Sequence, residues 1–121
     1  MTPAEIIKSD ADERELDHVP IVKSIGESID RGESIALHEN DSVLVVRKIS
    51  EEDAELHLFT ADKPLKLVKS VAAFIESLTE SHIKYFYGKA DKDHIIELLK
   101  ILGVNVEDSD KEEYNWKATL K

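Results

Sequence analysis

The segment from Glu55 to Val106 alternates between short strand-like runs and longer stretches in which apolar residues recur at helical spacing. The expected strands and helices are, in order, Glu55–Phe59, Pro64–Leu78, Ile83–Tyr87, Lys92–Leu102 and Val104–Val106. Two strands joined through a helix are most simply parallel, and such crossovers are almost always right-handed. Ligands of sheets of this kind bind beyond the carboxyl ends of the strands. The loop at residues 60–63 is therefore the first place to look for a functional site.

The residues before this segment predict antiparallel strands. Ser34–Glu39 and Ser42–Ile49 flank Asn40-Asp41, a two-residue turn of the type that accepts positive φ. The run Val43-Leu44-Val45-Val46 is continuously apolar, as in a strand that is buried on both faces. A turn at residues 50–53 leads into the next strand. Three antiparallel strands are therefore expected to precede the parallel unit.

The N-terminal region predicts one clear helix, over Val19–Arg31, with Pro20 in its first turn. Residues 1–18 are expected to form an N-terminal lead-in. This lead-in is either flexible or helical, or it contributes a short edge strand at Ile6–Ile7. Residues 19–121 are expected to form a single domain.

At the C-terminus, polar and apolar residues alternate in the pattern of a half-buried antiparallel strand. The apolar positions are Tyr114, Trp116, Ala118 and Leu120. An unprotected edge on this last strand would allow a homodimer, whereas Lys117 and Lys121 would serve to guard such an edge.

The composition limits the classes of partner. The chain has 121 residues, of which 41% are hydrophobic and 35% are charged, as expected for one soluble domain. Its net charge of −10 argues against general binding to nucleic acid or to anionic membranes, because both depend on a basic surface. There is no cysteine, and no apolar run approaches the ~20 residues that span a bilayer. We expect a cytoplasmic protein, or a component of a particle that is assembled in a host cytoplasm.

The order of predicted elements resembles the GNAT fold, which is named for its N-acetyltransferases. The resemblance is carried by the strand Glu55–Thr60, a lysine-rich helix start, a tyrosine-rich strand and the run Ile95–Val104. In detail the chain is similar to small, divergent GNAT-like proteins of tailed bacteriophages, some of which carry a head-assembly label. The resemblance implies an α/β fold with a mixed sheet, in which antiparallel strands are followed by a β-α-β-α-β-β unit.

The resemblance also implies where coenzyme A would bind. Active GNATs hold its pyrophosphate with backbone N–H groups at the start of the first crossover helix, where small glycines allow close approach. The corresponding stretch, Leu65–Ser70, contains no glycine, so it is a poor phosphate cradle. The candidate cofactor-binding residues are Thr60, Lys63, Lys66, Lys69 and Ser70. The lysines are alternatively a solvated helix face.

Two catalytic positions are implied in the same way. Many GNATs place a tyrosine four residues before the glycine that ends the second crossover helix, and here that position is Leu99, which cannot donate a proton. Tyr87, near the carboxyl end of its strand, is the preferred substitute acid, with core packing as the alternative. Glu55 is a candidate general base acting through water, although its early position in the strand predicts that it lies far from the cleft.

No metal site is expected, because His38 and His57 lack the spacing and the further ligands that such sites require.

Two functional hypotheses follow. The first is a non-catalytic GNAT-like phage protein that needs no cofactor and acts through contacts with proteins, such as phage structural proteins, in virion or head assembly. The second is an acetyl-CoA-dependent N-acetyltransferase for an amine substrate. The acidic loop at residues 107–113 is either a solvated loop or a surface that faces a partner.

Overall fold

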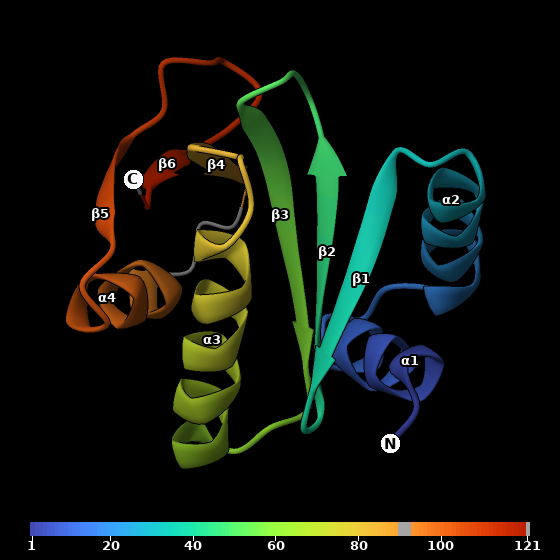
Figure 1. Ribbon diagram of the computed structural model, residues 1–121. Helices are drawn as coiled ribbons and strands as arrows, with labels where there is room; N and C mark the ends of the chain where they lie inside the picture. The colour runs from blue at the N-terminus through green and yellow to red at the C-terminus, as the bar shows by residue number, and fades with distance from the viewer. Residues whose placement is uncertain (90–92, 121) are drawn as a thin grey trace.

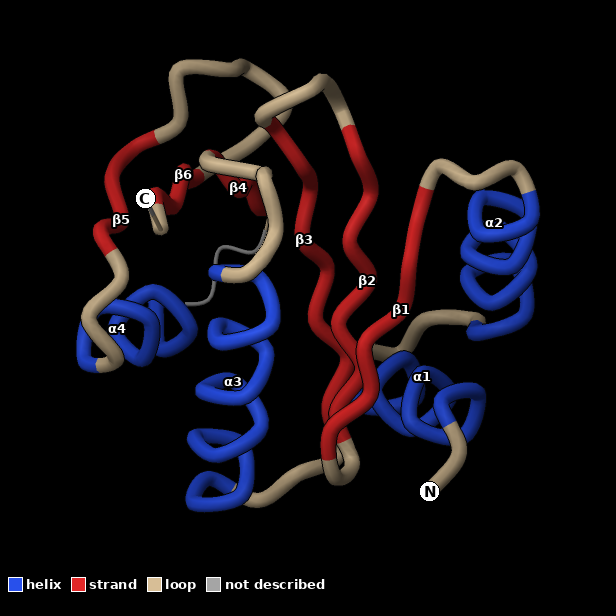
Figure 2. The backbone as a smooth tube through the Cα atoms, in the orientation of Figure 1, coloured by secondary structure: helices blue, strands red, loops and turns tan. Residues whose placement is uncertain are grey.

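The computed structural model describes residues 1–89 and 93–120, which form a six-stranded sheet with helices on both faces (Figures 1 and 2). The elements are α1 (Pro3–Glu13), α2 (His18–Asp30), β1 (Ser34–Glu39), β2 (Ser42–Lys48), β3 (Asp53–Thr60), α3 (Pro64–Thr79), β4 (Tyr85–Gly88), α4 (Asp93–Ile101), β5 (Asn105–Asp108) and β6 (Trp116–Thr119). No helix within the described residues is long and apolar enough to cross a membrane.

The strand order is β1-β2-β3-β4-β6-β5. Strands β1, β2 and β3 are antiparallel to one another, and β4 is parallel to β3. This arrangement confirms the predicted mixed sheet: the third antiparallel strand, β3, is also the first strand of a β-α-β-α-β-β unit.

The last strand is not at an edge, contrary to the expectation from its sequence. Strand β6 lies between β4 and β5 and is hydrogen-bonded to both. Trp116 and Ala118 are buried in the core, so the interior position removes their apolar side chains from water. Within the described residues, the sheet edges are therefore β1 and β5.

The two faces of the sheet carry separate hydrophobic clusters. On the face covered by α3 and α4, Leu44 packs with Phe74, Phe86 and Trp116. On the opposite face, Val43, Val45 and Phe59 pack against Ile6 and Ile7 of α1 and against apolar residues of α2. Successive side chains of β2 thus enter different clusters, which explains why its sequence is continuously apolar.

The N-terminal lead-in is helical and does not form an edge strand. Thr2 caps α1, and its side chain accepts a hydrogen bond from Glu5 N while the Glu5 side chain accepts one from Thr2 N. Helical geometry places Ile6 and Ile7 against the sheet, where both are buried. The Asp10 carboxylate accepts a hydrogen bond of 2.9 Å from the backbone N–H of Thr60, which attaches α1 to the end of β3.

Strands β3 and β4 pair over only a short distance. Their register joins Asp53, Ala54 and Glu55 of β3 to Tyr85, Phe86 and Tyr87 of β4, and β3 continues to Thr60 without β4 beside it. The two parallel strands therefore diverge after Glu55, and this divergence creates the space for a site.

Candidate functional site

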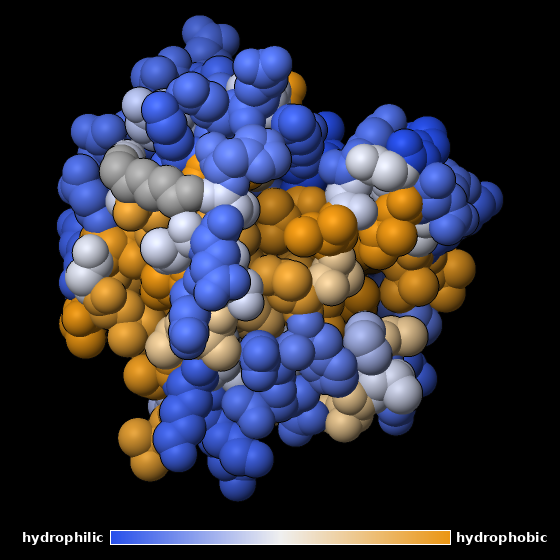
Figure 3. All heavy atoms as spheres, in the orientation of Figure 1, coloured by the Kyte–Doolittle hydropathy of each residue, from blue (hydrophilic) through white to orange (hydrophobic). Residues whose placement is uncertain are grey.

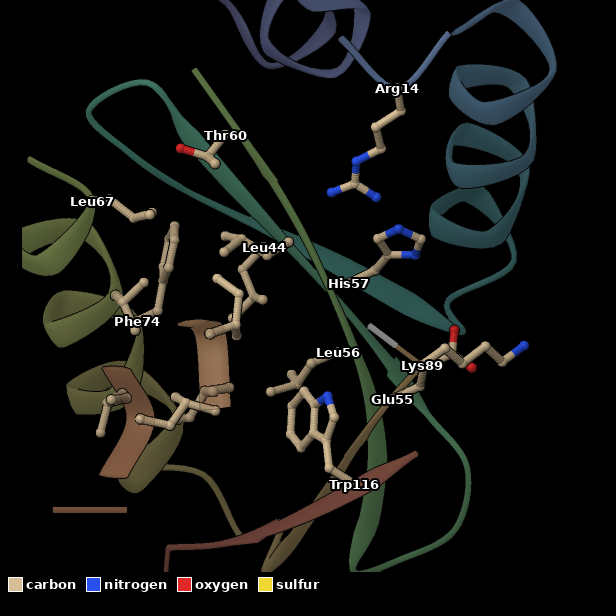
Figure 4. A pocket seen from close by; sticks show the side chains of 16 residues that line it. Arg14, Leu44, Glu55, Leu56, His57, Thr60, Leu67, Phe74, Lys89 and Trp116 are labelled. Carbon is tan, nitrogen blue, oxygen red and sulfur yellow. The ribbon is translucent and has the colours of Figure 1, made fainter. Parts of the chain in front are cut away.

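A groove with a volume of about 300 Å³ opens where β3 and β4 diverge (Figure 4). Most of its lining is apolar and comes from β2, β3, α3, α4 and β6; these residues are Leu44, Leu56, Leu58, Leu67, Val71, Phe74, Ile75, Leu78, Ile95, Leu99 and Trp116. Its polar lining residues are Arg14, Glu55, His57, Thr60 and Lys89. The groove thus combines an apolar wall beside α3 with a wall of charged and polar groups.

The backbone of β3 also faces this groove. Residues 55, 57 and 59 exchange hydrogen bonds with β2, as the register and the bond from Ala61 N to Asp41 O show. In an antiparallel pair the residues between them direct their N–H and C=O groups to the opposite side. Leu58 therefore presents its backbone N–H and C=O groups to the groove, and Leu56 presents its C=O group, because the Leu56 N–H group pairs with β4 at Tyr87.

Glu55 lies in the groove lining, closer to the cleft than its sequence position predicted. Its Oε2 atom accepts hydrogen bonds from Arg47 Nη2 at 2.9 Å and from Tyr114 Oη at 2.6 Å. Partial burial raises the pKa of Glu55, but these hydrogen bonds outweigh that effect and hold the pKa below its ordinary value. Glu55 is therefore a carboxylate at neutral pH, fixed by two donors.

His57 lies on the same polar side of the groove. Its ring stacks on Phe59 with the ring centroids 4.5 Å apart. Neighbouring groups remove water from the imidazole, and this desolvation lowers the pKa of His57. The positive charge of Arg14 lowers the pKa further, although part of the side chain remains exposed. The imidazole is therefore neutral at pH 7. In the described residues no group of three or more acidic or histidine side chains is arranged to hold a metal ion.

Tyr87, the preferred substitute acid, is not among the residues that line the groove. Its side chain is 2% exposed, and its hydroxyl donates a hydrogen bond of 3.1 Å to Asp110 Oδ1. Burial and the Asp110 carboxylate raise the pKa of Tyr87 to about 12. The Tyr87 hydroxyl therefore keeps its proton at neutral pH and donates it in a hydrogen bond to Asp110.

Tyr114, in contrast, is connected to the groove, because its hydroxyl donates a hydrogen bond to the Glu55 carboxylate in the lining. Burial and its bond to Glu55 raise the pKa of Tyr114 to about 12. The sequence pattern identified Tyr114 only as an alternating strand residue. No local signal connects it to Glu55, which lies 59 positions earlier.

The substitution Tyr114→Phe is expected to raise the pKa of Glu55 towards its ordinary value, because one hydrogen bond to the carboxylate is lost. In the wild type, the folded pKa lies below the unfolded value of about 4.3, so this contribution to stability is complete above the unfolded value and is lost as the pH falls towards the folded pKa. The variant should therefore lose less stability on acidification. Urea unfolding at pH 7 and pH 3.5 measures this, with Tyr85→Phe as the matched control; equal losses in wild type and Tyr114→Phe would contradict it.

Two candidate cofactor-binding residues, Thr60 and Ser70, lie close together. Their hydroxyl groups belong to a hydrogen-bonded cluster around the Asp62 carboxylate. Asp62 Oδ2 accepts hydrogen bonds from Ser70 Oγ at 2.8 Å and from Ser42 Oγ at 2.6 Å, and Asp62 Oδ1 accepts one from Asp41 N at 3.1 Å. Thr60 Oγ1 bonds to Ser42 Oγ at 2.7 Å. Ser70 is fully buried, so its hydroxyl is committed to this cluster, which we call the Asp62 cluster.

The start of α3 has no side-chain cap. Its N-cap residue is Lys63, which makes no side-chain hydrogen bond to the helix. The Asp62 carboxylate is turned towards Ser42 because three donors converge on it there. Lys63, Lys66 and Lys69 are exposed on the outer side of the helix.

Leu99, at the position where the resemblance implies a catalytic tyrosine, is buried and lines the groove. This position of the groove lining therefore carries an aliphatic side chain, which cannot donate a proton.

Two comparisons found no match: no family model matches the chain, and no curated protein matches it. Solved structures do match. GCN5 of Tetrahymena has a TM-score of 0.60 at 17% identity, with 98% of this chain and 86% of that chain covered. A spermidine N-acetyltransferase chimera of Vibrio cholerae SpeG and hSSAT has a TM-score of 0.56 at 9% identity, covering 98% of this chain and 90% of that chain. The chain therefore has the fold of the GNAT acetyltransferases.

Proposed function

We propose that this GNAT-fold protein does not transfer acetyl groups and that it acts through contacts with other proteins. The observation that carries the proposal is the Asp62 cluster at the start of α3. It places a negative charge and a committed set of hydroxyl groups where a GNAT enzyme would receive the pyrophosphate of coenzyme A.

The electrostatics of this region oppose a phosphate ligand. Hydrogen bonds from Ser42, Ser70 and the backbone of Asp41 outweigh partial burial, which alone would raise the pKa of Asp62, and the net pKa is lowered. Asp62 is therefore ionised at neutral pH and repels a second anion at this helix start. The residues present do not fit the phosphates of coenzyme A, and Leu99 adds no proton donor at the reacting end.

The proposed setting is the assembly of a tailed-phage head or virion in the host cytoplasm, with phage structural proteins as partners. Its support is the sequence resemblance to small GNAT-like phage proteins. The net charge of −10 agrees with a role that involves neither nucleic acid nor a membrane surface. Mass spectrometry of purified phage particles tests this setting, because a structural component should be retained in them.

An N-acetyltransferase is the second candidate, and the groove favours it. Glu55 is an ionised carboxylate in the groove lining, where it could accept a proton from an amine through water. The backbone N–H and C=O groups of Leu58 and the C=O group of Leu56 add a donor and acceptors beside it.

Calorimetric titration with coenzyme A and with acetyl-CoA at low salt separates the two candidates. We expect no saturable heat at millimolar ligand, for the wild type and for the charge-removing variant Asp62→Asn, because the glycine-free helix start remains. Micromolar binding by the wild type would reject the first proposal and revive the transferase. An active GNAT enzyme measured under the same conditions provides the positive control.

A further inference from the structure

We propose that the free edge of β1 pairs with β1 of a second copy of this chain, so that two sheets join across a two-fold axis. This inference is independent of the proposed function, because it concerns an edge of the sheet remote from the groove between β3 and β4 (Figure 1).

The hydrogen-bond pattern shows which backbone groups of β1 are available. Lys48 N donates to Glu33 O at 3.0 Å, so residues 33 and 48 form a hydrogen-bonded pair in the β1–β2 ladder. Counting along the register, residues 35, 37 and 39 also bond to β2. Ser34, Ala36 and His38 therefore direct their N–H and C=O groups away from β2. Ser34 is buried beside α2, whereas Ala36 and His38 are exposed to a partner.

The side chains leave the central part of this edge unguarded. Proteins protect edge strands with lysine, proline, bulges, inward-pointing charges or a covering helix. Helix α2 covers the Ser34 end, where Ser28 Oγ and Ser34 Oγ are 2.6 Å apart, and from Ile35 to His38 none of the other devices is present. Ile35 is 57% exposed, and Ala36 and His38 are exposed as well. Figure 3 shows hydrophobic surface on this face of the molecule between α3 and α2. The opposite edge, β5, has Glu107 and Asp108 as two of its four residues, whereas the acidic residues of the β1 edge, Glu33 and Glu39, stand at its two ends.

The strand is complementary to itself, which is why a second copy is the occupant that we propose. With the axis at Ala36, the two Ala36 residues face each other and each Ile35 faces Leu37 of the other copy. Cross-strand pairs of large apolar residues on one face are the stabilising units of antiparallel sheets. Glu33 would face Glu39 of the other copy, but Arg31 donates two hydrogen bonds to Glu33, at 3.1 and 3.3 Å, which offsets the repulsion.

Sedimentation equilibrium of the full chain over a range of concentrations tests the proposal. We expect a reversible dimer for the wild type. Ile35→Lys should weaken association by at least about ten-fold, because it places a charge in the apolar cross-strand pair. The matched control is Ile101→Lys, at an 81% exposed position on α4, which should dimerise like the wild type. Circular dichroism of each variant verifies folding.

A cross-linking experiment tests the register, because the chain has no cysteine of its own. Opposed hydrogen-bonded residues of antiparallel strands have Cα atoms about 5.5 Å apart, which suits a disulfide. Ala36→Cys should therefore form a covalent dimer under mild oxidation, whereas Ile101→Cys should not. A wild type that is monomeric at every concentration, a dimer that Ile35→Lys leaves intact, or equal cross-linking of the two cysteine variants would each overturn the proposal.

Discussion

Gly88→Ala is expected to destabilise the protein by about 3 kcal/mol, the upper part of the range for overpacked cores. Gly88 ends β4 and lies against the indole of Trp116, which is buried in the core on the α3 face. A Cβ atom at residue 88 would stand 2.1 Å from Trp116 Cζ2. A rigid ring fixed in a packed interior cannot move aside without displacing its neighbours. Urea unfolding measures the change as a shift in the free energy of unfolding.

The chain contains a matched control for this substitution. Gly26 lies inside helix α2, and a Cβ atom added there would meet nothing within 4 Å. Gly26→Ala should therefore stabilise the protein by about 0.5 to 1 kcal/mol, the helix propensity of alanine over glycine. A loss of less than about 1 kcal/mol in Gly88→Ala would show that Trp116 is free to move away from β4.

Ile6→Ala is expected to cost about 3 kcal/mol, within the range for truncation of a large aliphatic side chain in a core. Ile6 in α1 has 0% exposure and packs in the cluster of Val43, Val45 and Phe59. Its loss would remove transfer free energy and leave a cavity that only partly relaxes. The effect is measured by urea unfolding in the full chain.

Ile101→Ala is the matched control, since Ile101 is 81% exposed near the end of α4. Its free energy of unfolding should change by no more than about 0.5 kcal/mol. Similar values for the two alanine variants would mean that α1 is not docked on the sheet in solution.

Local patterns in the sequence predicted most of the elements. The hairpin around Asn40-Asp41, the helix that begins at Pro64 and the order of the β-α-β-α-β-β unit all agree with the structure. These predictions succeed because the two-residue period of strands and the 3.6-residue period of helices can be recognised from the spacing of apolar residues within one segment. The expectation of a poor phosphate cradle also rests on neighbouring residues, because the absence of glycine is visible in six consecutive residues, and it stays a prediction.

Periodicity failed where burial by distant segments decides the outcome. Ile6 and Ile7 are adjacent apolar residues among charged ones, which is compatible with a helix or with an edge strand. The choice depends on the sheet face that receives them and on the bond from Thr60 to Asp10. Strand β6 likewise looked like an edge strand, because its alternation does not reveal that it inserts between β4 and β5.

The sequence by itself determined the kinds and the order of the elements after the N-terminal lead-in, because these follow from spacing within single segments. Only the tertiary structure decided the site. Arg47, Glu55 and Tyr114 come from three strands or loops, and Asp62 meets Ser42 and Ser70 from two other elements. Their hydrogen bonds require atoms to lie within about 3 Å of each other, and the packing of distant segments alone sets such distances.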